Sequence, residues 1–166
     1  MQLSSKIVPC LWFDGRGEEA ARFYTAIFPD SAIEHIERFP AVGQEVHGQA
    51  AGSVMTVSFR LGAQQFVALN GGPQFKFNEA VSFQIMCDSA EEVDHYWNRL
   101  GEGGAPEAQQ CGWLKDKFGL SWQVVPRRFI EMLGDTDKSK TQRLFAAMMD
   151  MKKLDLPALE RAFNGQ

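Results

Sequence analysis

The chain contains an internal repeat, and this repeat limits the possible folds more than any other feature of the sequence. The segment 18–24 reads EEAARFY and the segment 91–97 reads EEVDHYW, so each has two acidic residues followed by apolar and aromatic residues at helical spacing. A strand candidate precedes each helix, at 6–13 before Asp14 and at 80–87 before Asp88, and strand-rich segments follow it, with a hairpin signal at 62–63. Ser89 and Glu92 form a capping box at the start of the second helix. We therefore predict a duplicated strand–helix–strand–strand–strand module. A chance similarity between two amphipathic helices is the alternative.

Each predicted module would leave one face of its sheet uncovered. Bringing two such curved, mixed sheets together would bury these faces around a cavity. The expected fold class is therefore α+β, with paired βαβββ modules at residues 1–76 and 77–126. Residues 127–166 have helical patterns throughout and are expected to form a helical C-terminal extension, with Asp155 as the cap of its last helix. The glycine-rich segment 41–52 has no period and is expected to be a mobile loop.

The segment 111–126, CGWLKDKFGLSWQVVP, is the clearest candidate for one wall of a cavity. It reads as a strand, a tight turn at 116–119 and a second strand, which Pro126 ends because proline has no N–H to donate. Alternate residues of a strand share a face, so Ser121, Gln123 and Val125 lie together. A polar amide in the middle of such a strand indicates either a pocket wall or an edge strand with one wet face.

The same alternation selects pocket-facing residues on the other strands. The four sets, in chain order, are Val8, Cys10 and Trp12; Phe66, Ala68 and Asn70; Ser82, Gln84 and Met86; and Ser121, Gln123 and Val125. From these sets and the neighbouring strand we predict the ligand-binding residues Cys10, Trp12, Asn70, Ser82, Gln84, Trp113 and Gln123. An apolar, aromatic cavity with a few neutral polar groups suits an uncharged or aromatic small molecule.

Composition excludes several other classes of function. The net charge of −4 argues against a nucleic-acid surface, and no apolar run of 18 residues indicates a membrane span. The three widely spaced cysteines form no disulfide or zinc framework, so a reduced, cytoplasmic protein is expected. Cys10 and Cys87 lie in apolar strands and are expected to be buried and inert, whereas Cys111 is expected to be the most accessible.

No cofactor, metal site or catalytic residue is expected. Residues 15–20 match the GxGxxA pattern of dinucleotide-binding turns, but Glu18 and Glu19 would repel a pyrophosphate. The three histidines have no ligand spacing. No carboxylate pair, base or partnered nucleophile lies among the pocket-facing residues.

Several motifs together resemble one protein family. They are WFDG, the helix at 18–28, SVMTVSF, FVALNGGP, FKFNEAVSF, CGWLKDKFGLSWQVVP and the tail segment MMDMKKLDLPALERAF. With these motifs the chain resembles the PhnB-like branch of the vicinal-oxygen-chelate (glyoxalase/bleomycin-resistance/dioxygenase) superfamily, a branch labelled 3-demethylubiquinone-9 3-methyltransferase. The resemblance implies paired βαβββ modules and a homodimer.

The resemblance also implies where a metal would bind. Enzymes of the superfamily hold one divalent metal on strand histidines and glutamates, and matching the motifs places Val8, Asn70, Ser82 and Gln123 at those positions. Valine cannot ligate, and neutral amide and hydroxyl oxygens bind transition metals poorly on their own. We therefore expect a metal-free protein that binds an unknown small molecule. The alternatives are an enzyme acting on a small aromatic or quinone-like substrate, as the methyltransferase label suggests, and an assembly module that acts through the helical tail.

Overall fold

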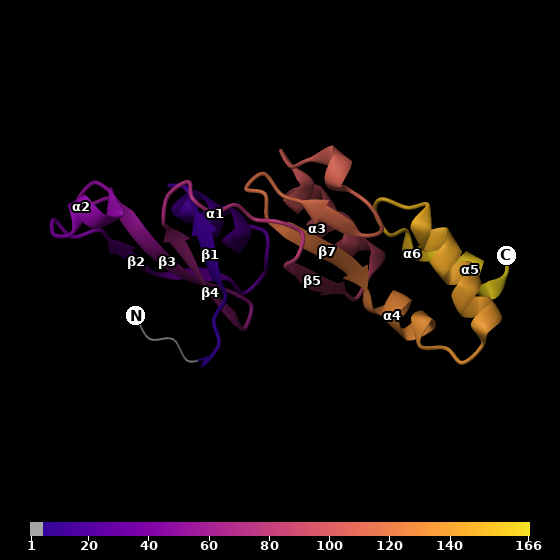
Figure 1. The fold of residues 1–166 in the computed structure, drawn as a ribbon. Helices are drawn as coiled ribbons and strands as arrows, with labels where there is room; N and C mark the ends of the chain where they lie inside the picture. Colours follow the sequence, from indigo (N-terminus) through magenta and orange to yellow (C-terminus); the bar gives the residue numbers. More distant parts are fainter. Residues whose placement is uncertain (1–4) are drawn as a thin grey trace. The chain divides into compact units, whose positions relative to one another are not determined.

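The computed structural model describes residues 5–166, so the first four residues of the predicted first module lie outside the described part. The chain divides into two compact units, the first ending at Lys76 and the second beginning at Phe77. Each unit has a mixed sheet with a helix on it, which confirms the predicted α+β class (Figure 1). Within residues 5–166, no helix is both long and apolar enough to cross a lipid bilayer.

The first unit is a four-stranded sheet in the order β1-β4-β3-β2, with α1 (Gly17–Thr25) packed on one face. β1 (Cys10–Phe13) runs parallel to β4 (Gln64–Asn70). β3 (Val54–Leu61) is antiparallel to both β4 and β2 (Ala32–Arg38), and the predicted hairpin at 62–63 joins β3 to β4. β1 is shorter than the predicted strand, which began at Lys6.

Aromatic rings fill the space between α1 and this sheet. Tyr24 of α1 stacks on Phe59 at 6.2 Å, and Phe59 stacks on Phe66 of β4 at 5.3 Å. Ala20 and Ala21 are fully buried, and their small side chains let the helix approach the strands closely. The helical spacing of apolar residues therefore predicted the buried face of α1 correctly.

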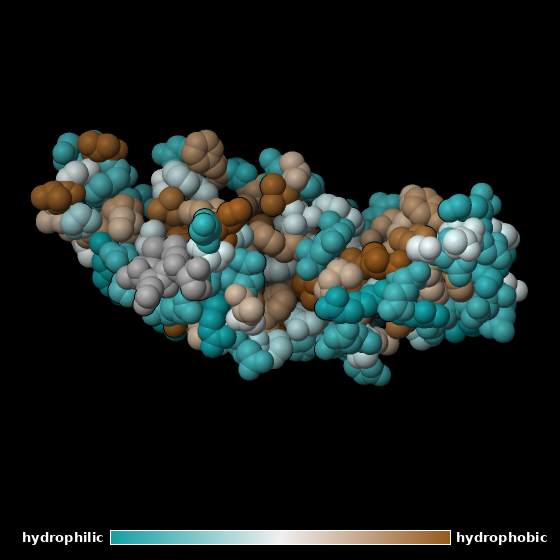
Figure 2. Space-filling view, turned by 90° about the horizontal axis from the view of Figure 1, so that it is seen from below, coloured by the Kyte–Doolittle hydropathy of each residue, from teal (hydrophilic) through white to brown (hydrophobic). Residues whose placement is uncertain are grey.

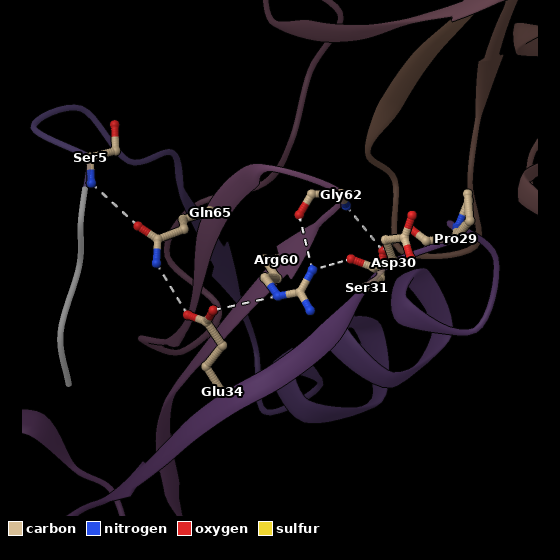
Figure 3. A network of polar contacts seen from close by, with 8 residues as sticks. All are labelled: Ser5, Pro29, Asp30, Ser31, Glu34, Arg60, Gly62 and Gln65. Atoms are coloured by element: carbon tan, nitrogen blue, oxygen red, sulfur yellow. Dashed lines mark hydrogen bonds and ion pairs between the residues drawn. The ribbon is translucent and has the colours of Figure 1, made fainter.

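Polar contacts tie together strand ends and turns of the first unit (Figure 3). Arg60 of β3 donates hydrogen bonds to the carbonyl oxygens of Asp30 and Gly62 and pairs with Glu34 of β2 at 3.8 Å. The Gln65 amide donates to the Glu34 carboxylate at 3.2 Å and accepts from the Ser5 N–H at 3.4 Å. These contacts fix the hairpin ends beside the segment that precedes β1.

The glycine-rich segment between β2 and β3, expected to be a mobile loop, contains a short helix, α2 (Gln44–His47). Gly43 and Gly48 flank it at φ +84° and +70°, a conformation that other residues rarely adopt. Val42 and Val46 are 75% and 86% exposed, and hydrophobic surface is visible where α2 lies (Figure 2).

The second unit has a three-stranded sheet in the order β5-β7-β6. β5 (Ser82–Cys87) is parallel to β7 (Ser121–Pro126), which pairs antiparallel with β6 (Trp113–Lys115). In both units the first strand is therefore parallel to the last, as the duplication predicts. The prediction of four strands in the second module is wrong, because a coil with the short 3-10 helix η1 (Pro106–Ala108) replaces one strand.

α3 (Ala90–Gly101) covers one face of this sheet with Val93, Trp97 and Leu100. The predicted capping box is present, since the Ser89 hydroxyl accepts from the Glu92 N–H at 3.3 Å. The Glu92 carboxylate accepts in turn from the backbone N–H of the residue before Ser89.

The C-terminal extension forms α4 (Arg127–Leu133), α5 (Lys138–Met149) and α6 (Leu156–Asn164). These helices share an apolar core, whose buried members are Val125, Phe129, Met132, Leu144, Leu154, Leu159 and Phe163. Backbone hydrogen bonds from Cys111 N–H to Met151 and from Gly112 N–H to Lys152 join the segment between α5 and α6 to the residues before β6. The predicted cap of α6 is confirmed, because the Asp155 carboxylate accepts from the Ala158 N–H.

Candidate functional site

The C-terminal helices cover the Val125 end of the second sheet's face opposite α3, and the uncovered part of that face, the open face, carries four of the seven predicted site residues. The parallel register sets Ser82 beside Ser121 and Gln84 beside Gln123, and Trp113 of β6 pairs with Gln123 from the other side. Residues paired directly across strands share a face, so these side chains project from the side opposite α3.

The Gln123 amide links its neighbours into a hydrogen-bonded row. Its Nε2 donates to the Ser82 hydroxyl at 2.7 Å, and its Oε1 accepts from Gln84 Nε2 at 3.1 Å. Each group in the row keeps further hydrogen-bonding capacity, including the Ser82 O–H and the Gln84 carbonyl oxygen. The row is therefore a neutral surface that can both donate to and accept from a bound molecule.

Ser121 adds an unused polar group to the same strand. Its hydroxyl is buried, and no hydrogen-bond partner for it lies among residues 5–166. A buried hydroxyl without a partner is costly, so native structures rarely leave one unmatched. The nearest charge in register is Lys115, which forms an ion pair with Glu79.

A buried carboxylate that sequence reasoning missed shapes the turn before this strand. Asp116 Oδ1 accepts from the N–H groups of Phe118 and Leu120 at 2.8 and 3.1 Å, and Oδ2 accepts from the Trp122 indole at 2.8 Å. Gly119 has φ +86°, as the turn prediction requires. An aspartate at the first position of a predicted turn is a signal for such backbone contacts. The position of β7, and with it that of Gln123, depends on this carboxylate.

In the first unit, Cys10 and Trp12 lie on the open face of the sheet, opposite Val67 and Leu69 of β4. Trp12 is half-buried and donates from its indole to the Gly72 carbonyl at 2.8 Å. Cys10 is exposed, so the expectation that it is buried is wrong. Partial desolvation nevertheless raises the pKa of the Cys10 thiol, which favours the neutral form.

Asn70 lies on the other face of its strand, with Phe66 and Ala68, and all three are buried. The prediction that these residues share a face with Cys10 and Trp12 is wrong, because the register pairs Asn70 with Phe13. Alternation assigns faces within one strand, but only the register between strands relates one strand to the next. The Asn70 amide accepts from the Gly17 N–H at 2.8 Å and donates to the Val54 carbonyl at 3.0 Å, so it holds the start of α1.

The other two cysteines differ in burial. Cys87 is buried, as predicted, and desolvation together with the nearby Glu92 and Asp88 carboxylates raises the pKa of its thiol to about 12. Cys111 is half-buried whereas Cys10 is exposed, so the expectation that Cys111 is the most accessible cysteine is wrong. The Cys111 Sγ lies 3.6 Å from the Met148 carbonyl oxygen, to which its S–H can donate a weak hydrogen bond.

Comparison with known proteins defines the class of this fold. A putative 3-demethylubiquinone-9 3-methyltransferase, a PhnB protein from Bacillus cereus, is 32% identical, with a TM-score of 0.64 over 74% of this chain and 99% of that chain. The protein PA1353 from Pseudomonas aeruginosa is 24% identical (TM-score 0.57, 74% and 98% of the two chains). The fosfomycin resistance protein FosX from Mesorhizobium loti is 14% identical (TM-score 0.51, 75% and 92%). The fold is that of the vicinal-oxygen-chelate superfamily.

The sequence model of the 3-demethylubiquinone-9 3-methyltransferase family matches residues 5–125, and the chain belongs to this family. The match ends before α4, so the three C-terminal helices lie outside the region that defines the family. Among curated proteins, none matches the sequence significantly.

The metal that the superfamily implies does not fit the residues at the matched positions. Val8 offers no donor atom, and the Asn70 amide already serves two backbone groups. Ser82 and Gln123 are neutral and hydrogen-bond to each other, whereas zinc, nickel and iron prefer imidazole, thiolate or carboxylate ligands. Within residues 5–166, no group of three or more histidine, cysteine or acidic residues is placed to hold a metal ion.

Proposed function

We propose that this protein binds an uncharged small organic molecule on the open face of the second sheet, without the help of a metal. The observation that carries the proposal is the row formed by Ser82, Gln123 and Gln84, in which one amide bridges a hydroxyl and a second amide. Two members of the row, Ser82 and Gln123, are neutral residues at positions where enzymes of the superfamily have the histidine and glutamate ligands of a metal.

The chemistry of the row indicates what kind of molecule it would hold. Amides and hydroxyls can each donate and accept, so they match a carbonyl, amide or hydroxyl group on the ligand. An anion would find no free cation in the row, and the nearest one in register, Lys115, is paired with Glu79. Trp113 supplies an aromatic surface beside Gln123, which favours a ligand with a flat ring.

The alternative is catalysis on a small aromatic or quinone-like substrate, as the family's name suggests. The name of the family to which the chain belongs favours this catalytic alternative. Methyl transfer to an oxygen needs a group that removes the acceptor's proton. The Ser82–Gln123–Gln84 row contains no side chain that titrates near neutral pH, so binding is the better-supported function.

The test uses the full chain and benzamide, a neutral flat amide, with benzoate as its charged counterpart. Saturation-transfer NMR should show benzamide, but not benzoate, bound to the wild type. Gln123→Ala should abolish the signal, because it removes the centre of the row. Gln142→Ala, which truncates an exposed glutamine of α5 in the same unit, should leave the signal unchanged. Equal benzamide signals from Gln123→Ala and the wild type would refute the proposal.

Native mass spectrometry of the same preparations would show a co-purified organic ligand and the mass of the assembly. We expect a homodimer. A co-purified compound lost from Gln123→Ala but retained by Gln142→Ala would support the proposed site and identify the class of ligand. Turnover of a substrate with S-adenosylmethionine by the wild type would instead favour the enzymatic alternative.

A further inference from the structure

A hollow separate from the Ser82–Gln123–Gln84 row lies wholly within the first unit, between α2 and the ends of β1, β3 and β4. Its volume is about 330 Å³, at the small end of the range for ligand pockets. Its walls contain no acidic residue, lysine or arginine, and the lining residues are Trp12, Phe39, Val46, His47, Gln49, Met55, Leu69, Asn70, Gly71 and Gln74. We propose that this hollow binds a small, flat, uncharged aromatic molecule.

Aromatic surfaces border the hollow on two sides. On the α2 side, the His47 ring stacks on Phe39 with centroids 4.7 Å apart. On the sheet side, the Trp12 ring lies against Gly71, where an added Cβ would come within 2.2 Å of the ring. Phe75 meets the Trp12 ring edge-on at 4.9 Å. Such walls favour a flat ring as ligand, because aromatic pairs stabilise each other by stacked and edge-to-face contacts.

Hydrogen bonds within the loop hold the His47 ring in place. The Gln49 N–H donates to its Nδ1 at 3.0 Å, and its Nε2 lies 3.4 Å from the Val42 carbonyl oxygen. The neck of the loop is closed by backbone hydrogen bonds between Phe39 and the residues at 52–53. These hydrogen bonds hold the α2 side of the hollow in a defined conformation, where the sequence alone indicated a mobile loop.

The polar groups of the lining show how such a ligand would be oriented. The Asn70 amide and the Trp12 indole are already used by backbone groups. The side-chain amides of Gln49 and Gln74 make no hydrogen bond to another described residue, so they remain able to bind a hydroxyl or carbonyl on the ligand. A charged ligand would lose its hydration without gaining an opposite charge from this lining.

The test is calorimetric titration of the full chain with 1-naphthol, and with 1-naphthoate as its charged counterpart. We expect 1-naphthol to bind and 1-naphthoate not to bind at the same concentrations. His47→Ala should weaken 1-naphthol binding about threefold to tenfold, the range that a lost aromatic contact gives. His35→Ala, which removes an exposed histidine of β2 outside the hollow, should leave the affinity unchanged.

A second substitution, Met55→Trp, fills the hollow from β3 and should reduce 1-naphthol binding more than tenfold, while the circular dichroism spectrum stays that of the wild type. Gln123→Ala removes the row on the second sheet and should leave 1-naphthol binding intact, so the two proposals fail separately. The inference is overturned if 1-naphthol does not bind, if Met55→Trp and His47→Ala bind it as tightly as the wild type, or if Gln123→Ala alone abolishes binding.

Discussion

Replacing Asp116 by alanine tests how the candidate site is held in place. The carboxylate is 3% exposed and accepts three hydrogen bonds, from the N–H groups of Phe118 and Leu120 and from the Trp122 indole. A hydrogen bond to a charged group contributes about 1.5–3 kcal/mol, and a buried donor left without a partner costs about 1–3 kcal/mol. Because neighbouring contacts are not additive, we expect Asp116→Ala to lower the free energy of unfolding by about 3–5 kcal/mol.

The assay is urea unfolding followed by tryptophan fluorescence and by circular dichroism. Asp116→Asn should fall between Asp116→Ala and the wild type, because the amide keeps one acceptor oxygen but turns an N–H₂ toward a donor. Asp88→Ala is the matched control. Its side chain is 72% exposed and forms one ion pair, with Arg127, so the loss should be about 0–1 kcal/mol. If Asp116→Ala costs no more than Asp88→Ala, the carboxylate does not hold this turn.

Three further substitutions test the packing, ionisation and capping described above. Gly71→Ala places a Cβ against the Trp12 ring and should cost about 1–3 kcal/mol in urea unfolding and shift the near-ultraviolet circular dichroism; an unchanged spectrum would contradict the close contact. Cys87, with its pKa raised to about 12, should resist iodoacetamide at pH 8 in the native protein. Because the thiol loses its proton at a lower pH in the unfolded chain than in the folded protein, the free energy of unfolding should fall as pH rises from about 9 toward 12. This fall should be less steep in Cys87→Ala, and equal slopes in the two proteins would show that the Cys87 thiol does not cause it. Asp155→Ala removes the cap that accepts from the Ala158 N–H and should cost about 1 kcal/mol, with an effect near zero counting against the cap.

Local patterns predicted those parts of the fold that depend on neighbouring residues. The helical spacing of Tyr24 and its apolar neighbours gave the buried face of α1, and Ser89 gave the start of α3. The repeat predicted that each unit has a strand, a helix and then further strands, because a duplicated pattern repeats its order of elements, but it did not give the order of strands in the sheets. The coil that replaces a strand in the second unit contains Gly103, Gly104 and Pro106, which break a strand pattern, so the sequence held a signal against a fourth strand there.

The errors at the candidate site come from relations between distant segments. Asn70 was assigned to the wrong face because the phase between β1 and β4 is set by their register. Alternation correctly put Ser82 and Gln84 on one face of β5, but their hydrogen bonds to Gln123 of β7 depend on the register between the two strands, which the sequence does not give. His47 was missed because its position depends on left-handed glycines on either side of α2, and a glycine-rich sequence does not specify which turn it forms.

The most direct test of the central claim is elemental analysis of the protein purified without chelators, followed by titration with Zn²⁺, Ni²⁺ and Mn²⁺. The neutral Ser82–Gln123–Gln84 row predicts less than stoichiometric metal in the purified protein and no saturable binding in the titration. One tightly bound metal per chain, lost on Gln123→Ala, would contradict the account and return metal-dependent chemistry to this face of the sheet.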